Sequence, residues 1–214
     1  MKTSIITLGG SAAGGDELRP AARLLSTGGI IIYPTETLYG IGADQFSGSA
    51  VDRIFKIKGR ERGVPIPLII GSPEMLGMAA DEVPEEAALL MKKFWPGPLT
   101  IIFRAVKSLP ENVHGGTGKV GVRLPGSETA RRLCAAFGGP VTATSANKSG
   151  EKGIRDPGEV RKKFINRVDM IIDGGITAGG APSTVVEPLR SGPVFIRRGA
   201  VPEEEIRLCL ERRR

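Results

Sequence analysis

Polar segments follow several apolar, strand-like runs, and their side chains are of the kind that binds an anion. The run at 29–33 continues into PTETLYGIGAD, which supplies the hydroxyls of Thr35 and Thr37 and the carboxylate of Glu36, followed by Gly40 and Gly42, glycines that are typical of turns. The run at 140–144 continues into SANKSG, which offers hydroxyls and an amide. Because ligands of open α/β sheets bind at strand ends, these segments are predicted to converge on one cleft.

Basic side chains accompany these hydroxyls. Four of them lie within seven residues in KIKGRER, at Lys56, Lys58, Arg60 and Arg62, and Arg197 ends a later strand-like run. Cationic groups among many hydroxyl donors suit a polyphosphate, which needs donors in number and no enzyme nucleophile. Taken alone, KIKGRER has an alternative interpretation as a solvated helix end whose charges favour the helix dipole. Its combination with TSAN and the hydroxyl segment favours a ligand site.

Several common functional patterns are absent from the sequence. TGKV at 117–120 lacks the rest of a Walker A loop, and there is no G-x-G-x-x-G turn or G-x-S-x-G elbow. The single histidine, His114, excludes most catalytic triads and multi-histidine zinc sites. Cys134 and Cys209 make neither a disulfide framework nor a metal cluster, and apolar runs reach only about five residues, too few to span a bilayer. We therefore expect a cytoplasmic protein without a membrane segment.

The charge of the chain is positive and unevenly distributed. The 214 residues carry a formal net charge of +7 and a sequence pI of about 9.7. Residues 1–107 hold 12 Lys/Arg against 11 Asp/Glu, or +1, whereas residues 108–214 hold 18 against 12, or +6. This asymmetry favours an anionic partner such as a nucleotide or a nucleic acid. The other interpretation is a solubilising surface, because Arg212, Arg213 and Arg214 supply half of the excess.

Short apolar runs alternate with helical patterns along the whole chain, which predicts an α/β fold with a twisted, mixed parallel and antiparallel sheet and flanking helices. Residues 1–214 are expected to form a single domain. Helices are predicted from Asp16 to Gly28, over 49–57, from Pro84 to Trp95, from Ser127 to Gly138, from Asp156 and from Pro202. Strands are predicted at 4–8, 29–33, 67–71, 98–103, 119–124, 140–144, 168–173, 183–187 and 193–197.

Eight motifs, taken in their order, resemble the YrdC-like threonylcarbamoyl-AMP synthases in their short, single-domain form. From about Leu24 to Ala200 they are PTETLYGIGAD, IFKIKGR, FWPGPLTIIF, VGVRLPG, TSANKSG, DGG, PSTVVE and FIRRGAV. The resemblance implies a YrdC-like fold with a basic concave cleft and a nucleotidyltransferase reaction. In that reaction L-threonine, bicarbonate and ATP give threonylcarbamoyl-adenylate and pyrophosphate. The adenylate then serves threonylcarbamoylation of an adenosine beside the anticodon of certain tRNAs.

The resemblance also implies roles for individual residues. By position, Lys58 and Arg60 are the catalytic cations, and they bind ATP together with Ser145, Asn147 and Arg197. Thr37, Arg123, Ala143 and Ser183 bind threonine, with Arg123 forking its carboxylate and Ala143 contributing backbone. Mg²⁺ is expected to enter with ATP, without a metal site made by the protein. The expected partners are the tRNA threonylcarbamoyl transferase, which receives the product, and double-stranded RNA or tRNA, bound weakly.

Three positions depart from the pattern of many longer members of the family. KGRERGVPIPLIIG contains two extra residues, Ile66 replaces an asparagine, Gly71 replaces a histidine, and Lys119 replaces a small hydroxyl residue.

Two other interpretations stand beside the synthase. One is a related, non-synthetic protein that binds double-stranded RNA or tRNA on a basic concave surface. The other is a carbamoyl-adenylate enzyme of hydrogenase maturation, whose acylphosphatase and zinc-finger regions this sequence lacks. The intact K-x-R and S-x-N elements, Ser183 and Arg197 favour the synthase.

Overall fold

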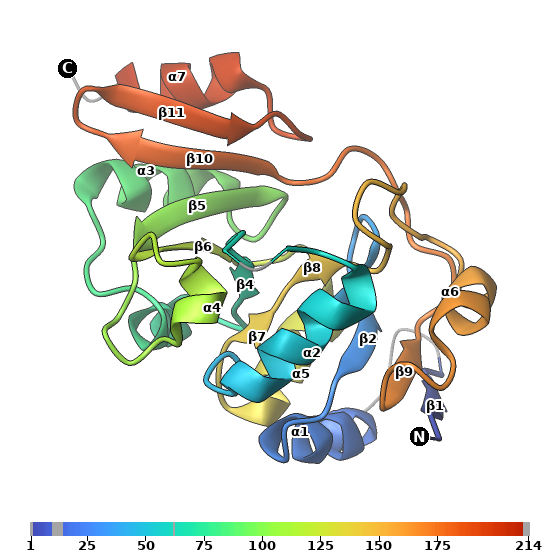
Figure 1. The fold of residues 1–214 in the computed structure, drawn as a ribbon. Helices are drawn as coiled ribbons and strands as arrows, with labels where there is room; N and C mark the ends of the chain where they lie inside the picture. The colour runs from blue at the N-terminus through green and yellow to red at the C-terminus, as the bar shows by residue number, and fades with distance from the viewer. Residues whose placement is uncertain (1, 10–14, 62, 212–214) are drawn as a thin grey trace.

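The strands of the protein form two mixed sheets (Figure 1). The structure is a computed structural model that describes residues 2–9, 15–61 and 63–211, so Arg62 and Arg212–Arg214 lie outside the described residues. The α/β class with parallel and antiparallel pairing is confirmed. The first sheet has the order β1 (Ser4–Thr7), β9 (Met170–Asp173), β2 (Ile31–Pro34), β3 (Tyr39–Gly42), β8 (Thr144–Ser145). The second has the order β11 (Gly192–Arg197), β10 (Thr184–Leu189), β5 (Leu99–Arg104), β6 (Lys119–Arg123), β4 (Leu68–Ile69), β7 (Val141–Thr142).

The two sheets are joined at Ala143, where the chain passes from β7 of the second sheet to β8 of the first. The Ala143 N–H donates to the carbonyl of Pro67 at 2.7 Å. Beside it, the Thr142 hydroxyl accepts from the Ala43 N–H at 2.8 Å, and the Thr142 N–H donates to the Ala43 carbonyl at 3.0 Å. These hydrogen bonds satisfy backbone groups at the junction that have no partner in either sheet's ladder. They therefore hold the edges of the two sheets against each other.

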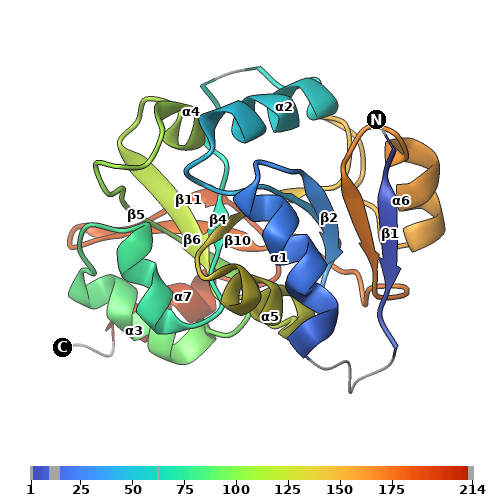
Figure 2. The same cartoon turned by 90° about the horizontal axis from the view of Figure 1, so that it is seen from below.

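Helices cover the sheets, and buried side chains of the helices and strands form two hydrophobic clusters. Figure 2 shows α1 (Arg19–Ser26) and α5 (Glu128–Phe137) lying side by side; both pack against β2, while α3 (Glu85–Phe94) and α7 (Glu203–Glu211) pack against the second sheet. Strand β2 is buried throughout: Ile32 packs in the larger cluster, and Ile31 and Tyr33 pack in the smaller one with Leu25 and Leu133. This alternation follows the two-residue period of a strand. The helices are α1 (Arg19–Ser26), α2 (Gly48–Lys58), α3 (Glu85–Phe94), α4 (Glu111–His114), α5 (Glu128–Phe137), α6 (Pro157–Phe164) and α7 (Glu203–Glu211), with 3₁₀ turns η2 (Gly15–Leu18) and η3 (Pro73–Met78).

The predicted helix starts at Ser127 and Asp156 are confirmed by capping bonds, whereas the helix predicted from Asp16 begins as a 3₁₀ turn over Gly15–Leu18 and becomes α-helical only at Arg19. Ser127 Oγ accepts from the Ala130 N–H at 3.3 Å, and Asp156 Oδ1 accepts from the Gly158 N–H at 2.7 Å. Helix α5 ends at Gly138 with φ +84°. No helix in the described ranges is long and apolar enough to cross a membrane.

The prediction that Gly40 and Gly42 are turn glycines of a polar segment is wrong. Tyr39–Gly42 forms β3, which is buried and pairs antiparallel with β2 and with β8. Gly42 is there because of close packing rather than a turn, since a Cβ on it would lie 2.7 Å from both Tyr33 Cε1 and Val141 Cγ1. A Cβ on Gly40 would likewise lie 3.1 Å from Tyr33 Cζ. The polar loop is therefore only the short connection between β2 and β3.

The three departures from the longer family members have structural explanations. Ile66 is fully buried in the larger cluster. The half-exposed Lys119 forms an ion pair through its Nζ with Glu187 Oε1 at 2.6 Å. Gly71 packs against the backbone of α5, where a Cβ would lie 2.7 Å from the carbonyl oxygen of Arg131. A histidine at this position has no room unless α5 moves.

We predict that Gly71→Ala lowers the free energy of unfolding by about 1–3 kcal/mol, because the added methyl meets backbone that cannot yield. Gly77→Ala is the matched control. Gly77 is exposed in η3, and a Cβ there has no atom within 4 Å. The free energy of unfolding of Gly77→Ala should therefore equal that of wild type or exceed it by up to about 1 kcal/mol. Urea denaturation of the three proteins measures this. Equal midpoints for Gly71→Ala and wild type would contradict the close packing.

Candidate active site

Lys58, the last residue of α2, connects the K-x-R element to the S-x-N element. The residue is only 4% exposed. The ammonium donates to the carbonyls of Ser145 and Asn147 at 2.5 and 2.9 Å, and to Asn147 Oδ1 at 2.9 Å. Asn147 Nδ2 donates in turn to the carbonyl of Glu151. Since an ammonium has three N–H donors, Lys58 is fully occupied in holding this loop. The solvated-helix-end interpretation therefore does not apply to Lys58.

Arg60 follows Lys58 after one residue, Gly59, in the left-handed backbone conformation. Gly59, at φ +58°, ends α2 and turns the chain, a conformation that favours glycine. Arg60 Nη2 donates to the carbonyl of Pro65 at 3.2 Å. The guanidinium keeps further N–H donors beyond this single bond, so Arg60 can contact a ligand without giving up its protein partner.

Ser183 and Arg197 come together at the start of β10 and the end of β11. Ser183 is buried, and its hydroxyl lies 2.8 Å from the hydroxyl of Thr100 on β5. Arg197 donates from Nε and Nη2 to the Ser183 carbonyl at 3.0 and 2.9 Å, and from Nη2 to its hydroxyl at 2.9 Å. The hairpin register brings Arg197 opposite Val185, next to an irregularity in the pairing. The two residues predicted to bind different substrates thus share one hydrogen-bonded unit.

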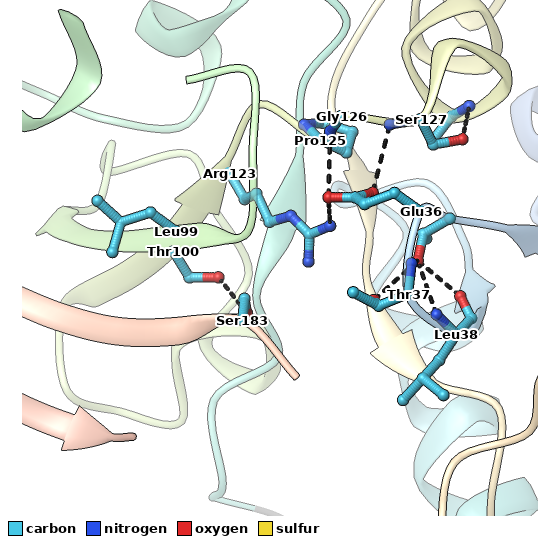
Figure 3. Close-up of polar contacts among 12 residues, drawn as sticks. Glu36, Thr37, Leu38, Leu99, Thr100, Arg123, Pro125, Gly126, Ser127 and Ser183 are labelled. Atoms are coloured by element: carbon cyan, nitrogen blue, oxygen red, sulfur yellow. Dashed lines mark hydrogen bonds and ion pairs between the residues drawn. The ribbon is translucent and has the colours of Figure 1, made fainter. Parts of the chain in front are cut away.

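Arg123 ends β6 and is 9% exposed. Its Nη2 forms an ion pair with Glu36 Oε1. The Nε of Arg123 is buried and has no hydrogen-bond partner among the residues that the structure describes. Figure 3 shows the Arg123 side chain lying between Ser183 on one side and Glu36 on the other. A buried N–H without an acceptor is costly, so this edge of the guanidinium is suited to an incoming anion.

Thr37 belongs to the same region, on the β2–β3 connection. Its hydroxyl lies 3.2 Å from the hydroxyl of Thr35, and its carbonyl accepts from the hydroxyl of Thr177 at 2.8 Å. Figure 3 places Thr37 next to Glu36 in this connection. Ala143 lies at the junction of the two sheets, with its N–H bonded to Pro67. Glu36, Thr100 and Thr177 are neighbours of the site that the sequence prediction left out. The single carboxylate among the hydroxyls of PTET was the available signal for Glu36.

The basic side chains influence one another through space. Burial lowers the pKa of Lys58 to about 8, with a further contribution from the charge of Arg60. Burial also lowers the pKa of Arg197, and the charges of Arg123 and Arg60 lower it further. Residues from α2, β6 and β11 therefore form one partly desolvated group of positive charge, which an anion would stabilise. No group of three or more His, Cys, Asp or Glu side chains suited to a metal ion occurs within the described ranges.

Comparison with known proteins fits this arrangement. Residues 23–199 match the family model Sua5_yciO_yrdC, described as telomere recombination. The chain belongs to the Sua5/YciO/YrdC family.

Individual members of the Sua5/YciO/YrdC family resemble the chain over most of its length. It is 40% identical over 190 residues to a threonylcarbamoyl-AMP synthase of Pyrococcus abyssi, covering 89% of this chain but 56% of that protein. The chain thus spans about half the length of that relative. It is 35% identical over 181 residues to a threonylcarbamoyl-AMP synthase of Halorhodospira halophila, covering 85% of this chain and 94% of that one. The crystal structure of P. abyssi Sua5 complexed with L-threonine superposes with a TM-score of 0.91 at 39% identity, over 97% of this chain and 61% of that one. The family resemblance predicted from the motifs is confirmed.

The lowered pKa of Lys58 predicts a pH-dependent stability. Between pH about 8 and 10.5 the folded protein has released this proton while the unfolded chain still holds it. The unfolded state then binds more protons, so the contribution of Lys58 to stability rises with pH across this window, by at most about 1.4 kcal/mol per pH unit. Urea unfolding at pH 7.5, 8.5 and 9.5 should show that the free energy of unfolding of wild type rises with pH relative to that of Lys58→Met. Lys56→Met, which alters an exposed lysine of the same helix, should run parallel to wild type. Parallel curves for Lys58→Met would refute the shift.

Proposed function

We propose that the protein is an L-threonylcarbamoyladenylate synthase, which forms threonylcarbamoyl-AMP and pyrophosphate from L-threonine, bicarbonate and ATP. The observation that carries the proposal is the group of buried positive charges beside an Arg123 whose Nε lacks an acceptor. One part of the group suits phosphates and the other a carboxylate. The name of the P. abyssi and H. halophila relatives and the L-threonine complex of P. abyssi Sua5 support the same assignment.

In the amino-acid half of the site, Arg123 takes the carboxylate of threonine. A guanidinium can bind a carboxylate with two parallel N–H bonds. The hydroxyls of Thr37 and Ser183 bond the polar groups of the substrate, and the backbone at Ala143 completes this half. The buried pair of Thr100 and Ser183 hydroxyls gives Ser183 a fixed orientation.

In the nucleotide half, Arg60 and Arg197 contact the phosphates, while Lys58 adds its charge and holds Ser145 and Asn147 in position. The amine of threonine and bicarbonate combine, with loss of water, to give threonine carbamate. An oxygen of this carbamate attacks the α-phosphorus of ATP, and the bond from that phosphorus to the bridging oxygen of pyrophosphate breaks. The cations neutralise the negative charge that develops, and positioning supplies much of the remaining acceleration. No covalent enzyme nucleophile is needed. Mg²⁺ accompanies ATP through the phosphate oxygens.

The proposal extends to the setting of the reaction. Residues 1–214 act as one YrdC-like domain, and the space faced by Arg60, Arg123 and Arg197 is the basic cleft. The product passes to the tRNA threonylcarbamoyl transferase in the cytoplasm. Double-stranded RNA or tRNA binds weakly, through charges that salt screens.

The phosphate half generates a mutational prediction. Arg60→Ala should lower kcat/KM for ATP about 10–150-fold, as expected for loss of a charge-assisted contact worth about 1.5–3 kcal/mol. Lys58→Ala should lower it by a similar factor, because it removes a positive charge and the three donors that hold the loop of Ser145 and Asn147. Arg190→Ala, which removes an exposed arginine in the turn between β10 and β11, should retain the wild-type rate. Initial rates of pyrophosphate release against ATP concentration measure this. Wild-type kcat/KM for ATP in both Arg60→Ala and Lys58→Ala would contradict a role of these residues in phosphate binding.

Threonine recognition generates a second prediction and the main test of the function. Pyrophosphate release from ATP in bicarbonate buffer should depend on L-threonine. 2-Aminobutyrate, which is threonine without its hydroxyl, should be far poorer, because it leaves hydroxyl partners in the site unpaired. Arg123→Lys keeps the charge but loses the fork, so it should raise KM for threonine more than KM for ATP. If 2-aminobutyrate matches threonine, or only KM for ATP rises, the assignment of the amino-acid half is wrong.

A further inference from the structure

The carboxylate of Glu36 is anchored by several hydrogen bonds beside Arg123. Its carboxylate accepts from three donors: Arg123 Nη2 and the Gly126 N–H, at 3.1 Å, bond Oε1, and the Ser127 N–H bonds Oε2 at 3.3 Å. Ser127 is the N-cap residue of α5, a ten-residue helix. Two of the three bonds are therefore to backbone, so the carboxylate stays anchored whether or not Arg123 contacts it.

Arg123 depends on Glu36 for its orientation. The charge of Arg123 acts unfavourably on Arg197, so the guanidinium lies in a positive field and gains from a fixed anion beside it. Glu36 engages Nη2, while the buried Nε has no acceptor among the described residues. A guanidinium left to itself would turn to satisfy that N–H. Its orientation toward the centre of the site therefore requires a fixed partner, and Glu36 is the partner present (Figure 3).

We propose that Glu36 is a positioning residue for amino-acid binding, which fixes the Arg123 guanidinium so that its remaining N–H groups meet the carboxylate of the substrate. This inference rests on the proposed function. A competing arrangement would make Glu36 a movable stand-in for the substrate carboxylate, which must leave before threonine binds. The two backbone bonds at Gly126 and Ser127 argue for a fixed carboxylate. The two arrangements predict opposite effects of removing the charge.

The first measurement is the threonine Kd of the full chain by calorimetry, together with KM for threonine and for ATP in the pyrophosphate assay. Glu36→Gln should weaken threonine binding about 10–100-fold and raise KM for threonine, with KM for ATP changing less than about threefold. Glu128→Gln is the matched control, because it removes an exposed carboxylate from the first turn of α5, the helix whose N-cap residue, Ser127, bonds Glu36. It should leave both constants unchanged. Unchanged or tighter threonine binding by Glu36→Gln would overturn the inference.

A double-mutant cycle with Arg123→Lys tests whether Glu36 acts through Arg123. If it does, Glu36→Gln in the Arg123→Lys background should change the threonine Kd by less than about threefold, whereas additive effects would overturn the inference. If Glu36→Gln fails to fold by circular dichroism, Glu36→Asp replaces it, with the same expected split between threonine and ATP. Wild-type protein that binds no threonine would overturn the proposed function itself, a result distinct from normal binding by the Glu36 variants alone.

Discussion

Positive charge held away from water, between the ends of two sheets, is the constraint on which the rest of the structure depends. Lys58 and Arg123 are each less than a tenth exposed, and desolvation of a charged group costs free energy unless partners compensate it. The compensation is local: loop carbonyls for Lys58, Glu36 for Arg123 and the Ser183 carbonyl for Arg197. Each of these acceptors belongs to a segment that the sheets hold in place, so the frame must be rigid for the cations to remain buried.

The sheets provide that rigidity because each cation lies at the end of a regular element. Lys58 ends α2, Arg123 ends β6 and Arg197 ends β11, so their backbones are fixed by helix or ladder bonds up to the point where the side chain leaves. The junction at Ala143 and the bonds between Ala43 and Thr142 hold the two sheets against each other. The site therefore spans two sheets, and its geometry depends on bonds that lie outside it.

Local sequence patterns predicted the elements whose signal is carried by their own side chains. Apolar runs marked nine strand regions, but the single strand predicted at 140–144 is divided between β7 and β8, which belong to different sheets. Ser127 and Asp156 marked helix starts, since capping depends on neighbours in the chain. Strand β3 was missed because Gly40 and Gly42 offer no side-chain pattern; their reason is the ring of Tyr33 across the sheet. The partnership of Glu36 with Arg123 spans 87 positions, and no local pattern encodes it. The K-x-R and S-x-N elements were predicted by resemblance, but that Lys58 donates to the S-x-N loop was visible only in three dimensions.

The donors that remain available differ between the two halves of the site. Lys58 uses all three of its N–H groups on the loop that carries Ser145 and Asn147, so its effect on a bound phosphate is through charge and through the position of that loop. Among the described residues, Arg60 donates to one protein acceptor, the carbonyl of Pro65, and the Nε of Arg123 has no acceptor. Both guanidinium groups therefore keep N–H donors for a ligand. An anion would therefore gain direct bonds from the arginines, while Lys58 maintains the surface on which it rests. Exchange of Lys58 for arginine would disturb that loop, because a planar fork cannot reproduce three converging bonds from a single nitrogen.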